Sequence, residues 1–379
     1  MVRPVSSEHF SSSHGNTKTV PFVIALISTV AMATDRTLLT FLGLIAAAAV
    51  FSALYLATSI FAPVACALFI IAIVWPLQSR LQLYLPQLLA LAIVISVTVV
   101  VFFVFASTVA WGFGRIGRAL ITEAPRFQLL YDHAATWLEG HGIAVAGLWA
   151  EHFNIRWLIR LLQGVTGRLN TTISFWIVVI VYVILGLLEV KTIARKLRTL
   201  LSDETARFLI SAGALTASKF RRYMLIRTIM SVATGAMVWV LAAMSGLQFA
   251  TEWGVIAFTL NYIPFIGPFI ATLFPTLYAL AQFESLQAAL LVFACLNVIQ
   301  FVIGSYIEPR VSGSALAISP FIVLFSVFFW TYMWGLFGSF IGVPITIAAL
   351  TFCSQHSSTR WLAELLGAPD ENAAIVESR

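Results

Sequence analysis

Charged residues are scarce in this chain: Asp, Glu, Lys and Arg make up 10% of its 379 residues, whereas hydrophobic residues make up 60%. Soluble domains carry about 25% charged residues, so this composition excludes an ordinary soluble protein and indicates a membrane protein. The 22 Lys and Arg residues form no dense run among stacking aromatics. We therefore expect the lipid bilayer, and not a nucleic acid, as a partner.

Motifs for catalysis and metal binding are lacking as well. The three cysteines, Cys66, Cys295 and Cys353, have no CxxC spacing, so neither a disulfide framework nor a zinc site is indicated. No two histidines lie four residues apart, and no GxSxG, HExxH or P-loop motif occurs. We expect no catalytic residue, no metal and no cofactor. Without a P-loop, active transport would use a gradient unless a separate ATPase subunit assists.

Long uncharged stretches indicate membrane-spanning helices. A helix of about 20 residues crosses a hydrocarbon core of about 30 Å, and the first uncharged stretch, 37–79, is long enough for two helices joined near Thr58, Ser59 and Pro63. The sequence predicts an all-α polytopic membrane protein with about eight transmembrane helices. These lie near 37–57, 61–78, 88–111, 171–190, 224–245, 253–281, 286–307 and 314–352.

Polar segments divide the spans and set their orientation. Because Lys and Arg favour the cytoplasmic side, a basic segment at 191–222 is expected in the cytoplasm, which places the N-terminus inside and the insertion after the third span outside. The predicted order is a polar tail with a short interfacial segment (1–36), helices one to three (37–111), an extracytoplasmic amphipathic helical insertion (112–170), helices four to eight (171–352) and a C-terminal tail (353–379).

The sixth span is expected to break or tilt. As one helix, 253–281 would be about 43 Å long, well beyond the hydrocarbon core. Prolines lack an N–H group, so the carbonyls of Leu260 and Pro264 lose their helical partners, and such backbone is tolerated only inside protein or beside a wet cavity. The break contains the residues Asn261, Pro264, Gly267 and Pro268.

The last uncharged run, 314–352, is also too long for one span. We expect a hairpin or two half-helices, with Ser319 as N-cap and Pro320 at the first helical position. The glycines and proline that would bend it are Gly335, Gly338, Gly342 and Pro344. Paired Gly/Pro interruptions favour a transporter binding site, although prolines can also merely kink packed helices.

Between the two breaks, polar residues recur on one helical face. Asn297, Gln300, Gly304 and Glu308 are spaced for a single face at 3.6 residues per turn, which we expect to look into the protein or a cavity. Interhelical hydrogen bonding is the alternative. Glu308 and Arg310 flank Pro309, where they are expected to pair, to gate, or to lie in the headgroup layer.

These motifs resemble the AI-2E family of transporters over about 37–352. The family's Asn-x-Ile-Pro-x-x-Gly-Pro break matches Asn261 to Pro268, its Glu-Pro-x-x-x-Gly segment matches Glu308 to Gly313, and its final glycine-rich region ends at Pro344. The resemblance implies an eight-helix protein of the bacterial inner membrane, assembled as a homo-oligomer, with a pentamer expected, that exports autoinducer-2 or another small polar solute. Some relatives resemble sodium or lithium/proton antiporters.

Our hypothesis is that a small polar solute or monovalent cation binds where the break at Asn261 to Pro268 meets the one at Gly335 to Pro344. The face with Asn297 and Gln300 would complete the site, with Glu308 and Arg310 at its end. A cation/proton antiporter is one alternative, although no acidic residue lies near the middle of a span. A scaffold or sensor, in which 112–170 binds a partner, is the alternative outside transport.

Overall fold

The computed structural model describes residue 38 and residues 41–141, 169–312 and 318–367. All regular elements in these ranges are helices, and the single extended pairing there is an isolated bridge between Ile318 and Gly367. The chain divides into two units, Met1–Ala57 and Thr58–Arg379. The described part of the first unit is an apolar helix, Phe41–Leu56. The interfacial segment predicted within 1–36 lies outside the described residues.

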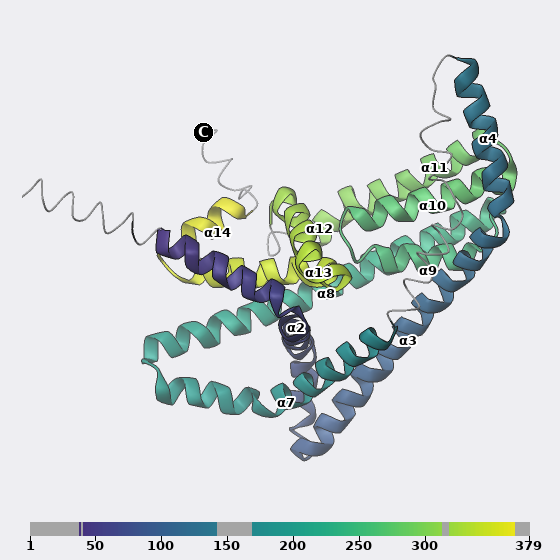
Figure 1. Ribbon diagram of the computed structural model, residues 1–379. Helices are drawn as coiled ribbons and strands as arrows, with labels where there is room; N and C mark the ends of the chain where they lie inside the picture. The colour runs from purple at the N-terminus through teal and green to yellow at the C-terminus, as the bar shows by residue number, and fades with distance from the viewer. Residues whose placement is uncertain (1–37, 39–40, 142–168, 313–317, 368–379) are drawn as a thin grey trace, which may run out of the picture. The chain divides into compact units, whose positions relative to one another are not determined.

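The second unit contains the remaining helices (Figure 1). In chain order they are α2 (Thr58–Leu81), α3 (Gln87–Thr122), α4 (Ala124–Gly140), α7 (Leu169–Leu200), α8 (Asp203–Met244), α9 (Ala250–Leu260), α10 (Ile266–Phe283), α11 (Leu286–Phe301), the π-helix η1 (Val302–Ile307), α12 (Glu308–Ser312), α13 (Pro320–Gln355) and α14 (Arg360–Leu366).

The protein is an all-α, polytopic membrane protein, as the sequence predicts. Seven helices of the described ranges are long and apolar enough to cross a membrane, and the helix Phe41–Leu56 is a shorter apolar one. Large apolar side chains such as Leu88, Phe103 and Leu291 are exposed on these helices. A bilayer, unlike water, accommodates such a surface without cost.

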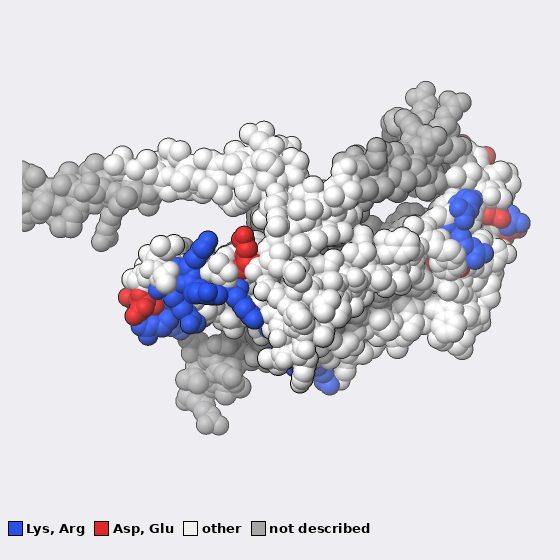
Figure 2. Space-filling model, turned by 90° about the horizontal axis from the view of Figure 1, so that it is seen from below, with Lys and Arg blue, Asp and Glu red and all other residues white. Residues whose placement is uncertain are grey.

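The basic segment at 191–222 is almost entirely helical. It is formed by the end of α7 and the beginning of α8, which are joined in a tight turn where Ser202 caps α8 by accepting a hydrogen bond from the Thr205 N–H at 3.3 Å. Lys and Arg side chains gather on this hairpin (Figure 2). With 42 residues, α8 is about 63 Å long, so it extends well beyond a hydrocarbon core of about 30 Å.

The described part of the insertion at 112–170 is helical, as predicted. The helix that contains the third span continues beyond 111, because α3 extends to Thr122 and α4 follows after one residue. Residues 142–168 of the insertion lie outside the described residues. The same holds for most of the C-terminal tail, of which 353–367 is described and contains α14.

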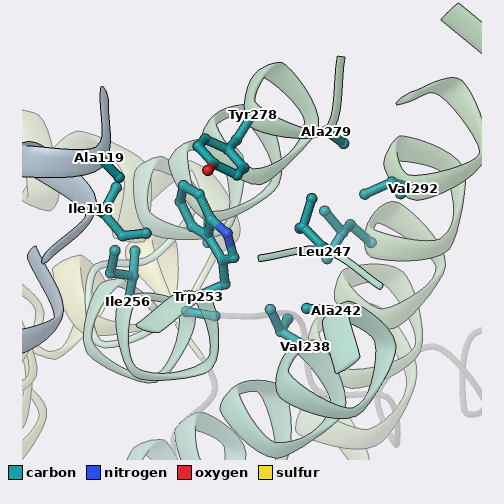
Figure 3. Packing of buried hydrophobic residues seen from close by; sticks show 13 residues of the cluster. Ile116, Ala119, Val238, Ala242, Leu247, Trp253, Ile256, Tyr278, Ala279 and Val292 are labelled. Carbon is teal, nitrogen blue, oxygen red and sulfur yellow. The ribbon is translucent and has the colours of Figure 1, made fainter. Parts of the chain in front are cut away.

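The main core lies where α3, α8, α9, α10 and α11 meet (Figure 3). Trp253 at the start of α9 is almost completely buried, and its ring lies 5.8 Å from that of Tyr278 on α10. Helices α8 and α9 approach closely at two glycines: a Cβ atom on Gly254 would lie 2.9 Å from the Gly235 carbonyl oxygen. Small residues allow such close packing of helices in membranes, and α9 is thereby fixed against α8.

Candidate functional site

The predicted break in the sixth span is present between α9 and α10, over residues 261–265. The two carbonyls that lose their helical partners find new ones in turns. The Leu260 carbonyl accepts from the Ile263 N–H at 2.9 Å, and the Pro264 carbonyl accepts from the Ile266 N–H at 2.7 Å. These turn bonds satisfy the backbone that the prolines interrupt, so side chains, more than free carbonyls, are available to a ligand here.

The break is tightly wound and carries backbone strain. Phe265 has φ of 62° and ψ of −56°, a region that costs a residue with a Cβ atom about 1–3 kcal/mol. Glycine is the one residue type that fits at position 267, because a Cβ atom there would overlap the carbonyl of Leu260. Gly267 is therefore required for the chain to turn back from α9 into α10.

Polar side chains of the break bind α8. Asn261 is 5% exposed and its Nδ2 donates to the Ser231 hydroxyl at 3.3 Å, while the Tyr262 hydroxyl donates to Thr228 Oγ1 at 3.0 Å. Ser231 itself is completely buried. Two hydrogen-bonded pairs of polar side chains thus lie inside a membrane domain, which is the arrangement expected around a polar pathway.

The last uncharged run forms a hairpin, one of the two arrangements predicted. Within α13, Trp334 and Gly335 have non-helical backbone angles, and Gly335 has φ of 63°. The arms 320–333 and 336–355 pack together, since the Ser326 and Thr346 hydroxyls lie 2.8 Å apart.

Two glycines allow the two arms of α13 to pack together. A Cβ atom on Gly338 would overlap the Trp330 carbonyl, and one on Gly342 would lie 2.9 Å from the Trp330 Cβ. Ser319 is the N-cap residue and Pro320 lies in the first turn, both as predicted, although the Ser319 side chain makes no capping hydrogen bond with a described residue. Pro344 is buried in the second arm.

The two breaks lie side by side. The Tyr262 ring is 5.6 Å from the ring of Phe340, which stands between Gly338 and Gly342 in the second arm of α13. Phe105 of α3 adds an edge contact to Tyr262 at 6.0 Å. The structure therefore brings the Asn261 to Pro268 and Gly335 to Pro344 segments together.

The polar face predicted on the next span is divided. Asn297 is exposed and donates to the carbonyl of Phe293 on its own helix. Gln300 is half-buried, and its buried Nε2 has no hydrogen-bond partner in the described ranges. After Phe301 the helix widens into η1, which changes the angular register, so Glu308 does not follow the 3.6-residue period. The widening precedes Pro309, whose ring would clash with the carbonyl four residues earlier.

Glu308 pairs with an arginine of another helix and not with Arg310. Arg227 Nη1 on α8 lies 3.0 Å from Glu308 Oε1 and 3.1 Å from Oε2. The Arg227 side chain is 10% exposed and that of Glu308 24%. Arg310 stacks instead over the Tyr306 ring, 3.9 Å from its centroid.

Sequence analysis missed a buried polar face on α8 that includes this arginine. Its members are Thr216, Tyr223, Arg227, Ser231 and Thr234, all buried. Their spacing of seven, four, four and three residues keeps them on one side of a helix. They extend over about 27 Å. We call this the α8 polar face. The periodicity is visible in the sequence, but the Lys and Arg residues of this stretch were interpreted as orientation signals alone.

Several atoms of the α8 polar face are unsatisfied. Thr216 Oγ1, Arg227 Nε and Thr234 Oγ1 are buried without a hydrogen-bond partner among the described residues, while the Tyr223 hydroxyl interacts with the Arg227 guanidinium. Each unsatisfied buried polar group costs about 1–3 kcal/mol, and such groups in native structures usually bind water or an ion. The α8 polar face therefore offers buried polar atoms close to Asn261, which is hydrogen-bonded to Ser231 of this face.

Comparison with known proteins agrees with this architecture. The sequence profile of the AI-2E family transporter matches residues 44–357. The chain is 27% identical to the "AI-2 transport protein TqsA" of Escherichia coli (strain K12), over 82% of this chain and 90% of that protein. It is 31% identical to the "Putative transport protein YhhT" of the same strain over 55% and 57% of the two chains. A "Putative transport protein" of Haemophilus influenzae is 25% identical over 86% and 96%.

Proposed function

The chain belongs to the AI-2E family of transporters, and we propose that it moves a small polar solute along the α8 polar face. The observation that carries this proposal is the row of buried polar atoms on α8 that have no hydrogen-bond partner among the residues that the structure describes. They lie on the same helix face as Ser231, which binds Asn261 at the first break. Polar groups within membrane domains normally face a water-filled cavity or the bundle interior. Water, or the hydroxyl groups of a solute, would satisfy them.

The proposed binding site is the junction of the two breaks. Its first part is Asn261, Pro264, Gly267 and Pro268, its second is Gly335, Gly338, Gly342 and Pro344, and Asn297, Gln300, Glu308 and Arg310 extend it along α11 to α12. Gln300 offers a buried amide nitrogen that bonds to no residue in the described part of the chain. Because both breaks are points where helices change direction, movement about them would alternately expose the site to the two sides.

We propose autoinducer-2 as the solute and export as the direction. The support for the solute is the relative TqsA, whose name gives AI-2 transport. The proposed location is the bacterial inner membrane, with the N-terminus and the basic α7–α8 hairpin in the cytoplasm, since Lys and Arg favour that side. Assembly as a homo-oligomer, with a pentamer expected from the family resemblance, is part of the same proposal.

A sodium or lithium/proton antiporter is the second candidate, and one observation favours it. Glu308 is a half-buried carboxylate held by Arg227, next to the α8 polar face. A carboxylate that exchanges an arginine for a proton or a sodium ion is what such coupling needs. The sequence placed Glu308 only near a span end, so this candidate is stronger with the structure than without it.

Flux through the purified protein in liposomes separates the two candidates. Autoinducer-2 movement and sodium-driven proton movement are measured in the same preparation. We expect saturable autoinducer-2 flux that falls at least tenfold in Asn261→Ala and Gln300→Ala. The control is Gln287→Ala, at an exposed glutamine on the same helix as Gln300, which should leave the flux unchanged. Sodium-dependent proton flux without movement of autoinducer-2 would overturn the exporter in favour of the antiporter.

A further inference from the structure

A second polar site lies at the C-terminal end of α8, far from the α7–α8 hairpin. Two arginines one turn apart on α3, Arg115 and Arg118, line a cavity of about 260 Å³. The other residues that line it are Ala119, Thr122, Glu123, Gln248, Phe249 and Tyr278. An adjoining cavity of about 570 Å³ shares Arg115, Gln248 and Phe249. Charged side chains of both signs gather at this end of the second unit (Figure 2).

Arg115 is held in a fixed position. Its Nη1 lies 2.8 Å from Oε1 of Glu252, whose side chain is only 4% exposed. The guanidinium also lies against two rings, 5.6 Å from the centroid of Trp111 and 5.8 Å from that of Phe249. Glu252 lies in the first turn of α9, where the helix dipole favours a negative charge. A guanidinium has five N–H donors, so Arg115 keeps donors for a ligand. Because its contacts already order the side chain, a ligand would not have to do so.

Gln248 is fixed as well and has a free donor. Its backbone N–H donates to Gln282 Oε1 at 2.8 Å, and its carbonyl accepts from Trp253 Nε1 at 3.1 Å. Its side-chain Oε1 accepts from the Tyr278 hydroxyl at 3.2 Å. This last bond orients the amide and leaves Nε2 as a donor that no residue of the described ranges uses. Tyr278, which lines the cavity, belongs with Trp253 to the main core (Figure 3), so Gln248 is bonded to packed side chains.

Among the described residues, the charges around the cavity leave one cation without an ion-pair partner. Glu252 offsets Arg115, and Glu123 is 3.1 Å from Arg126. Arg118 makes no ion pair with any described residue, and it is exposed at the cavity wall. Arginine binds carboxylate and phosphate groups through paired N–H donors. At about 260 Å³, the cavity is smaller than the pockets of about 300 Å³ or more that hold drug-sized ligands, so it suits a group no larger than an oxyanion.

We propose that Arg115, Arg118 and Gln248 form a binding site for a small oxyanion, a carboxylate or phosphate group. The group would accept from the free N–H groups of both arginines and from Gln248 Nε2. Two sources carry this chemistry, a soluble anion and the phosphate of a lipid headgroup. The proposal can be tested independently of the transported solute, because ligand binding at this site is measured without transport.

The test is binding of inorganic phosphate to the full chain, purified in a maltoside detergent that carries no phosphate. The same preparation is analysed for phosphatidylglycerol that stays bound through purification. The variants are Arg118→Gln and Gln248→Glu, the second of which keeps an acceptor for Tyr278 but adds a negative charge. Arg115 is left intact because its loss would strand the buried Glu252. Arg80→Gln, at an exposed arginine of α2, is the matched control.

We expect saturable phosphate binding that weakens at least tenfold in Arg118→Gln and Gln248→Glu and is unchanged in Arg80→Gln. If free phosphate does not bind, but retained phosphatidylglycerol falls in the same two variants, the oxyanion is a lipid headgroup. If neither phosphate nor retained lipid differs between wild type and the two variants, while all elute as folded protein, the proposed site does not exist.

Discussion

Arg227 and Glu308 form a two-contact ion pair between α8 and α12, across 81 residues of sequence. The apolar side chains of Ile226, Met230 and Ile303 pack together beside it. Removing one partner from a buried pair leaves an uncompensated charge, which costs more than the intact pair contributes. The pair therefore ties the start of α12 to α8 at the middle of the α8 polar face.

Neutralising either partner alone is predicted to destabilise the protein. Arg227→Gln and Glu308→Gln should each lower the free energy of unfolding by about 2–3 kcal/mol, a value reduced for the partial exposure of Glu308. The double variant should recover most of that loss, because no charge is left unpaired. Thermal unfolding in detergent measures both effects, with Lys196→Gln, at an exposed position of α7, as control. Additive losses in the double variant would contradict the pairing.

The hairpin in α13 is predicted to depend on Gly338. In Gly338→Ala the new Cβ atom meets the Trp330 carbonyl, so the arms must separate at a cost of about 3 kcal/mol. The readout is a disulfide between Ser326→Cys and Thr346→Cys, whose hydroxyls lie 2.8 Å apart. This bond should form in an otherwise wild-type background and be lost when Gly338→Ala is added.

Gly213→Ala is the control for that experiment. Gly213 lies in α8, and no described residue lies within 4 Å of the position that a Cβ atom would take there. Alanine should stabilise the helix there by about 0.5–1 kcal/mol, and the α13 disulfide should form as before. An unchanged disulfide in Gly338→Ala would show that the arms are not in close contact.

Strain at the first break is predicted to be removable. Phe265 has a positive φ and is about half exposed, so Phe265→Gly should raise the free energy of unfolding by about 1 kcal/mol. The comparison is Phe269→Gly, also exposed but within α10, where glycine should cost about 1 kcal/mol. Equal losses in both variants would indicate that Phe265 is not strained.

Much of the fold follows from local sequence signals. Pro264 and Pro268 remove backbone donors, and Gly335 and Gly338 permit a reversal, so both breaks are predictable from single residues and run lengths. The extension of α3 to Thr122 was missed because Arg115 and Arg118 end the uncharged run. Charge marks where a side chain prefers water, and it does not mark where a helix ends.

The partners within the candidate site could not be predicted in the same way. Arg227 with Glu308, and Arg115 with Glu252, are pairs from distant parts of the chain, and nothing local to either residue specifies the other. The α8 polar face is different, since its spacing is visible in the sequence. Its burial is set by how α8 packs against its neighbours, which only the structure provides.

The central claim is that the α8 polar face is a hydrated pathway, and thiol labelling tests it most directly. Ser231→Cys and Thr234→Cys are made in a background in which Cys66, Cys295 and Cys353 are replaced by alanine, with Val232→Cys, on the exposed side of α8, as control. A charged, membrane-impermeant methanethiosulfonate is added to liposomes while flux is recorded. Labelling of 231 and 234 that blocks flux, with 232 unlabelled, is the predicted result. Protection of 231 and 234 in actively transporting liposomes would contradict the pathway.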